Sequence, residues 1–215
     1  MKHILIIFIL SGIAASVDGQ LPCDNDTTGY VALVDLKSDY FMDGYQGGLY
    51  PGGENEMPAT HRLAGSKVVK NIKPLDTLGN VDLINGKIVF LGLGASTAGN
   101  TWNNFNDLVE DEPGLNPCLQ LVNGSQGAKG LDVMIDTLNY PWYWTDMVFT
   151  KMSAQGATPI QVQAIWLRTA SKTDTIVEFP LFPNGIADKL EILLPILLDK
   201  FPNLKQVYIS GFFYG

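Results

Sequence analysis

The sequence predicts an α/β fold with a mainly parallel sheet, and three observations support this prediction. Segments with the helical spacing of apolar residues alternate with short apolar runs, as in βαβ units. The composition, 46% apolar and 17% charged residues, is that of a globular protein with one core. The apolar runs have the length of buried strands and lie at 87–93, 119–122, 162–167 and 204–209.

The chain before the first strand divides into two parts. Residues 1–19 have the pattern of a signal peptide, with Lys2, an apolar run at 4–10 and small residues at 11–16. Because this run is too short to span a membrane, we expect a secreted or periplasmic protein without a membrane span after cleavage. Residues 20–86 are rich in Gly, Pro, Asn and Asp, so we expect an irregular segment that packs on the domain 87–215.

Helices are predicted between the later strands. One runs from about 142 to 154 and ends at Gln155-Gly156. Thr158 and Pro159 then form a cap and a first-turn proline. The clearest helix covers 186–201, where apolar residues form one broad face and Pro195 is expected to produce a kink.

Polar clusters follow three of the predicted strands. Right-handed crossovers place the carboxyl ends of parallel strands along one edge of the sheet, and ligands bind at that edge in open α/β folds. The clusters are at 95–97, 123–127 and 168–171. Thr97, Asn123 and Arg168 are therefore candidate substrate-binding residues.

Ser96 has two possible roles. Just beyond a buried strand, its hydroxyl could act as a nucleophile, because a following helix would direct N–H groups toward the developing oxyanion. Serine is also one of the commonest helix caps, and this feature alone favours the cap. The glycine-rich segment VNGSQGAKG at 122–130 favours the nucleophile instead, since Gly127 could offer the oxyanion a backbone N–H that no side chain obstructs.

These two segments resemble the SGNH hydrolase superfamily of serine esterases and lipases. GLGAST at 92–97 is similar to the family's nucleophile block, although Ala95 replaces the usual Asp. The resemblance to an exported, mostly uncharacterised bacterial branch extends from about Tyr45 to the end. It implies a three-layer flavodoxin-like sandwich, with Ser96 as nucleophile and Gly127, or less surely Ala128, as oxyanion donor. The segments that carry the resemblance lie at 45–61, 72–97, 122–130, 155–168 and 201–210.

Two departures from the family pattern affect the predicted activity. After the third strand the family has an Asn, whereas this chain has LRTAS at 167–171. The Asp-x-x-His block is missing, and the two histidines are His3, in the predicted signal peptide, and His61, upstream of the first strand. We therefore expect a fragment that is incomplete at the C-terminus and catalytically impaired.

The leading hypothesis is an exported serine esterase for a small-molecule or carbohydrate ester, such as an acetyl ester. The alternative is a non-catalytic binding module that keeps the SGNH-like sheet. An α/β-hydrolase elbow is a third reading, but that fold builds several strands before its nucleophile.

Charge and residue counts exclude other classes. The net charge of -8 argues against nucleic-acid binding. No metal ligand set or dinucleotide fingerprint is present, so no metal or cofactor is expected. The acidic turn at 107–112 is interpreted as solvated surface, and the aromatic cluster at 142–149 as core. Cys23 and Cys118 form one disulfide or remain two thiols.

Overall fold

The computed structural model describes residues 31–41, 44–172 and 178–211. The predictions for the signal peptide, for Cys23 and for the last four residues lie outside this part of the chain. Internal contacts divide the chain into two units, 1–58 and 59–215. Cys118 is half-buried and has no bonded partner among the described residues, so its pairing with Cys23 stays a prediction.

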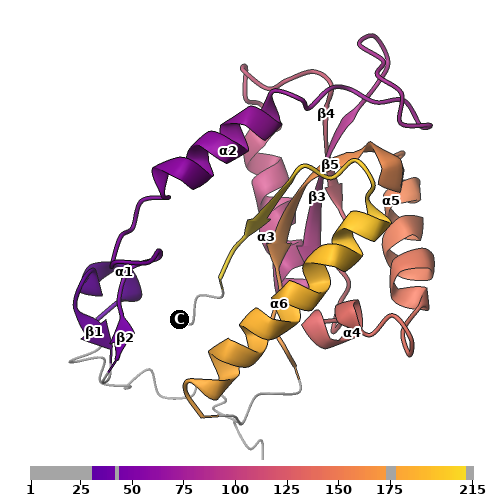
Figure 1. Ribbon diagram of the computed structural model, residues 1–215. Helices are drawn as coiled ribbons and strands as arrows, with labels where there is room; N and C mark the ends of the chain where they lie inside the picture. Colours follow the sequence, from indigo (N-terminus) through magenta and orange to yellow (C-terminus); the bar gives the residue numbers. More distant parts are fainter. Residues whose placement is uncertain (1–30, 42–43, 173–177, 212–215) are drawn as a thin grey trace, which may run out of the picture. The chain divides into compact units, whose positions relative to one another are not determined.

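The second unit contains the predicted parallel sheet (Figure 1). Its strands follow the spatial order β4-β3-β5-β6, so β3, the first of these four in the chain, is an inner strand of the sheet. All four predicted strands are confirmed within two residues of their expected bounds. These are β3 (Ile88–Gly94), β4 (Leu119–Asn123), β5 (Val162–Arg168) and β6 (Gln206–Ile209).

Helices connect the strands, as the α/β prediction required. Between β3 and β4 lies α3 (Ser96–Val109). The predicted helix at 142–154 is present, but its first part is a π-helix rather than an α-helix. The remaining connections contain α4 (Leu131–Ile135), η1 (Tyr143–Phe149), α5 (Thr150–Ala154), η2 (Pro159–Gln161) and α6 (Leu181–Lys200).

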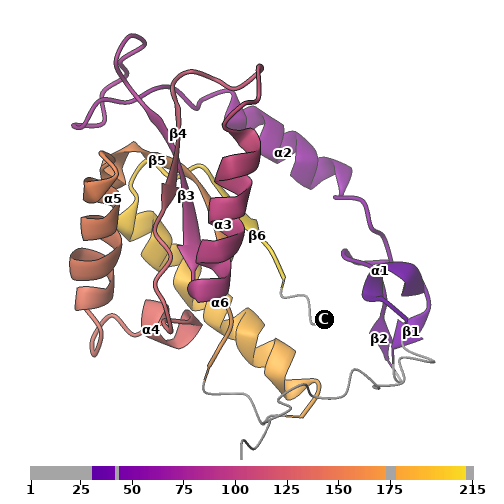
Figure 2. The same ribbon diagram turned by 180° about the vertical axis from the view of Figure 1, so that it is seen from behind.

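Two layers of helices enclose the sheet, which confirms the three-layer sandwich. Figure 1 shows α6 in front of the sheet, and Figure 2, from behind, shows α3 on the opposite face. The main core lies on the α6 face, where alternate residues of β3 and β5 pack against α4, η1, α5 and α6. Tyr143 and Trp144 are fully buried there, as expected of core aromatics. Pro195 lies inside α6.

The α3 face is covered less completely. The largest buried side chain of α3 is Trp102, which is 3% exposed. A Cβ atom at Gly92 would lie 2.4 Å from the Trp102 indole, so the glycine allows this ring to rest directly on β3.

The segment expected to be irregular, 20–86, contains an 11-residue helix, α2 (Ala59–Val69). It belongs to the second unit and reaches the sheet through Gly65, whose carbonyl accepts a hydrogen bond from Gln206 of β6. The first unit, considered by itself, has a short helix and a two-stranded antiparallel hairpin. These are α1 (Leu33–Leu36), β1 (Tyr40–Phe41) and β2 (Tyr45–Gln46).

Candidate functional site

Ser96 is the first residue of α3, and it is not the helix cap. Ala95 takes the cap position, with extended backbone angles and no side-chain capping bond. The turn into the helix depends on Gly94, whose φ of +144° is a conformation that other residues rarely adopt. Ser96 is exposed, and its hydroxyl makes no hydrogen bond within the described residues. The capping interpretation is therefore wrong, and the hydroxyl lies at the amino end of a 14-residue helix.

The loop after β4 runs beside the end of β3. The backbone N–H of Gly124 donates to Gly92 O and that of Gln126 to Gly94 O, each at 2.9 Å. Gly127 is the next residue, and it is exposed, with open space where a side chain would be. Its N–H has no acceptor among the described residues. The sheet thus brings the loop that carries Gly127 to the same edge as Ser96.

The adjacent Ala128 adopts a left-handed backbone conformation, with a φ of +58°. Such a conformation is uncommon for a residue with a side chain and occurs often at functional loops.

A side-chain network fixes this loop against α3. Asn123 donates through Nδ2 to Asn103 Oδ1 at 2.7 Å, and its Oδ1 accepts bonds from the hydroxyl and the N–H of Ser125. A Cβ atom at Gly99 would lie 2.4 Å from Ser125 Oγ, so helix and loop are in close contact. The amide of Asn123, predicted to bind substrate, is thus engaged in holding the loop.

Lys151, in α5, and Gln155, directly after this helix, support the loop from the other side. Neither residue was identified from the sequence. Lys151 donates from Nζ to Ser125 O at 2.8 Å, and burial lowers the pKa of its ammonium group. The Gln155 side chain donates to Asn123 O and accepts from Asn123 N, each at 2.9 Å. It therefore pairs with the edge of β4 as a neighbouring strand would. No local pattern indicates such contacts between residues about thirty positions apart.

The other two predicted binding residues are Thr97 and Arg168. Thr97 is exposed, and its carbonyl accepts a hydrogen bond from the Thr101 hydroxyl at 3.0 Å. Arg168, at the end of β5, donates from Nη1 to Thr101 Oγ1 at 2.8 Å. The Arg168 side chain thus contacts α3 about one turn beyond Ser96, whereas Thr97, next to Ser96, takes part only through its carbonyl.

The residues after β5 form a separate ionic cluster. Asp132 accepts hydrogen bonds from Lys189 Nζ at 2.7 Å, from the Ser171 hydroxyl at 2.9 Å and from Lys172 N at 2.8 Å. Burial raises the pKa of Asp132, but these donors outweigh it and hold the pKa at about 2. The carboxylate is therefore ionised at neutral pH and ties together α4, α6 and the end of β5.

A general base for Ser96 is not evident in the described part of the chain. His61 is the histidine within it, and it is exposed on α2. That helix reaches the sheet at the start of β6, whereas Ser96 follows the end of β3. The geometry therefore supplies a hydroxyl, a helix terminus and a loop N–H, without an assigned proton acceptor.

Metal and membrane features are similarly limited. Within residues 31–41, 44–172 and 178–211, no group of three or more His, Cys, Asp and Glu side chains is arranged to hold a metal ion. No helix in these ranges has the length and apolar character needed to cross a membrane. The acidic turn at 107–112 is mostly exposed, in agreement with a solvated surface.

Comparisons with known proteins give no independent assignment. No protein-family model matches the chain, and neither the curated proteins nor the solved structures contain a significant match.

Proposed function

We propose that this chain is an exported serine hydrolase of SGNH type, acting on a small-molecule or carbohydrate ester. The single observation that carries the proposal is the position of Ser96. Its hydroxyl is exposed at the amino end of α3, while Ala95 is the cap. A serine that neither caps the helix nor donates to a described neighbour is available for chemistry.

The loop after β4 supports the same reaction. In acyl transfer, the hydroxyl oxygen of Ser96 bonds to the ester carbonyl carbon, and the carbonyl oxygen becomes negatively charged. The N–H of Gly127 and the helix terminus would stabilise that charge. The C–O bond to the alcohol then breaks, and the departing alkoxide takes up the serine proton through a base. An activated ester instead releases a stable anion, so solvent water can accept the serine proton. Release of the acyl group still requires a base that activates water, so we expect activated esters to acylate Ser96 faster than the acyl group is hydrolysed.

The test uses an activated ester whose leaving group needs no proton. The protein is incubated with p-nitrophenyl acetate and digested, and mass spectrometry then locates the acetyl group. We expect acetylation at Ser96, loss of that label in Ser96→Ala, and an unchanged label in Ser66→Ala, a matched exposed helical serine on α2. Acetylation elsewhere, or none, would contradict the proposal.

A non-catalytic binding module is the second candidate, and one observation favours it. Asn123 is committed to the loop network, and Arg168, at the position where the family has Asn, contacts Thr101 rather than the loop. A module of this kind would bind an ester without acylation, and unlabelled Ser96 with measurable ester binding would identify it.

A further inference from the structure

The ammonium group of Lys151 has uncharged partners, although it is half-buried. Its Nζ lies 2.8 Å from Ser125 O and 3.4 Å from Asn123 Oδ1, at the start of the loop after β4. Lysine ion pairs in the described part of the chain involve Lys189 and Lys200 rather than Lys151. A cation without a counter-ion is costly to bury, and burial lowers the pKa of this group. A lysine kept at such a cost indicates a function for this position.

The bond to Ser125 fixes one peptide group of the loop at both ends. Ser125 O accepts from Lys151, and the N–H of the same peptide group, that of Gln126, donates to Gly94 O at 2.9 Å. A trans peptide group is planar, and its C=O and N–H point in opposite directions. The two bonds therefore fix the rotation of this group about the chain.

The next peptide group carries the N–H of Gly127. Its carbonyl oxygen, Gln126 O, accepts a hydrogen bond from Lys129 N at 3.2 Å. Because C=O and N–H lie on opposite sides of the peptide plane, the N–H of Gly127 is directed away from Lys129. This donor has no acceptor in the described part of the chain. Its direction thus follows from two successive peptide groups, and Lys151 holds the first of them from outside the loop.

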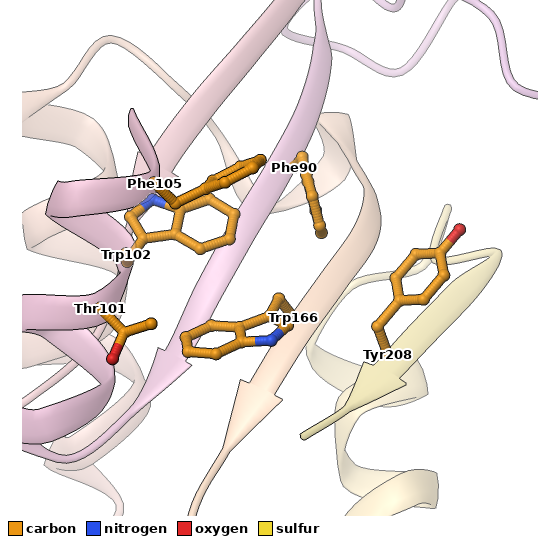
Figure 3. Close-up of a pocket in the computed structure, with 6 residues that line it drawn as sticks. All are labelled: Phe90, Thr101, Trp102, Phe105, Trp166 and Tyr208. Atoms are coloured by element: carbon orange, nitrogen blue, oxygen red, sulfur yellow. The ribbon is translucent and has the colours of Figure 1, made fainter. Parts of the chain in front are cut away.

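On its other side the loop rests on α3, which is anchored to the sheet. Gly99 and Asn103 of this helix contact the loop. Figure 3 shows Trp102, on the opposite side of α3, among the aromatic rings of a pocket of about 470 Å³. The ring centroid of Trp102 lies 5.0 Å from that of Phe90 in β3 and 5.8 Å from that of Trp166 in β5. The loop is therefore held between a fixed helix and the Lys151 ammonium group.

We propose that Lys151 is a positioning residue, which directs the N–H of Gly127 toward the oxyanion formed at Ser96. This role of Lys151 depends on the hydrolase function proposed above. An oxyanion donor contributes only when its N–H points at the oxygen, and loss of one such donor slows acyl transfer by about 10²- to 10³-fold. A donor turned out of line should therefore slow the acylation of Ser96 by at least about tenfold.

The first measurement compares two lysine variants. Lys151→Met keeps a long side chain but removes the charge and the N–H donors. Lys87→Met is the matched control, because Lys87 Nζ also donates to a backbone carbonyl, Gly156 O, at 2.8 Å, near the amino end of β3. Acetylation of Ser96 by p-nitrophenyl acetate is followed by mass spectrometry at several ester concentrations, under conditions in which urea unfolding shows both variants fully folded.

We expect the maximal rate constant of Ser96 acetylation to fall at least about tenfold in Lys151→Met, with an unchanged half-saturating ester concentration. Lys87→Met should keep both values. An unchanged rate constant in Lys151→Met would overturn the positioning role while the hydrolase proposal stands. A raised half-saturating concentration with an unchanged maximal rate constant would also overturn it, because Lys151 would then act on ester binding.

The second measurement reports on the donor itself and needs no reaction. Residual dipolar couplings in NMR depend on the direction of an N–H bond within the folded protein. We expect Lys151→Met to change the coupling of the Gly127 amide and to leave those of β5 unchanged, whereas Lys87→Met changes neither. An unchanged Gly127 coupling would overturn the role of Lys151. Absence of acetylation in the unmodified protein would overturn the hydrolase proposal, and the coupling would still decide whether Lys151 directs this N–H.

Discussion

Replacement of Asp132 by Asn is expected to remove a defined pH dependence of folding stability. In the folded chain its carboxylate accepts hydrogen bonds from Lys189, Ser171 and the backbone of Lys172. These donors hold the pKa at about 2, against an ordinary value of 3.8. Asn keeps the size of the side chain but carries no charge, so the variant isolates the ionisation.

The sign and size follow from the lowered pKa. Because the folded-state pKa lies below the unfolded value, the stabilisation is fully present above pH 3.8 and is lost as the pH falls through about 2. A shift of this size corresponds to about 2.4 kcal/mol at about 1.36 kcal/mol per pKa unit. Solvent reaches the side chain, which is 22% exposed. We therefore expect a contribution of about 1 to 2 kcal/mol to the free energy of unfolding.

Urea unfolding at pH 6, 4 and 2.5 measures this contribution. Other carboxylates titrate equally in both proteins, so the difference between unmodified protein and Asp132→Asn reports on this group. We expect the unmodified protein to be more stable at pH 6, and the difference in free energy of unfolding to fall to about a third of its pH 6 value at pH 2.5, half a unit above the folded pKa. A difference that stays constant over this range would refute the argument.

Three further substitutions test how the Ser96 edge is built. Gly94→Ala would place Cβ 1.9 Å from Arg168 O at a φ of +144°, so we expect a loss of about 3 kcal/mol or more in urea unfolding. Gly127→Ala enters open space and should change stability by less than about 0.5 kcal/mol, which makes it the control. Gln155→Leu removes both bonds to the Asn123 backbone and should cost about 1 to 3 kcal/mol, with faster hydrogen exchange at the Asn123 amide. An unchanged exchange rate would contradict that role.

The sheet was predictable because its two inner strands, β3 and β5, are mostly buried. Such strands are continuous apolar runs, and the runs at 87–93 and 162–167 needed no knowledge of distant residues. The helix α2 was missed for the opposite reason. It has no buried residues, so its sequence lacks the apolar periodicity on which a helix prediction depends.

The candidate site was predictable only in part. The end of β3 located Ser96, and the glycine-rich loop located Gly127, because both are local features of the chain. The same reasoning left open whether Ser96 caps the helix, and only the backbone angles of Ala95 decided that question. The hydrogen bonds of Asn123 with Asn103 and Gln155 could not be predicted, since they join residues that are 20 and 32 positions apart in the sequence.

Arg168 is the clearest departure from the family pattern near the candidate site. In the resembled family an Asn follows the third strand and belongs to the serine site, whereas the Arg168 side chain donates from Nη1 to Thr101 Oγ1 of α3. Because this bond joins the side chain to α3 about one turn beyond Ser96, we expect Arg168→Asn to leave the rate of Ser96 acetylation unchanged. Mass spectrometry over a time course measures that rate. A faster acetylation would mean that the side chain at residue 168 reaches Ser96, and the argument from the Thr101 contact would then fail.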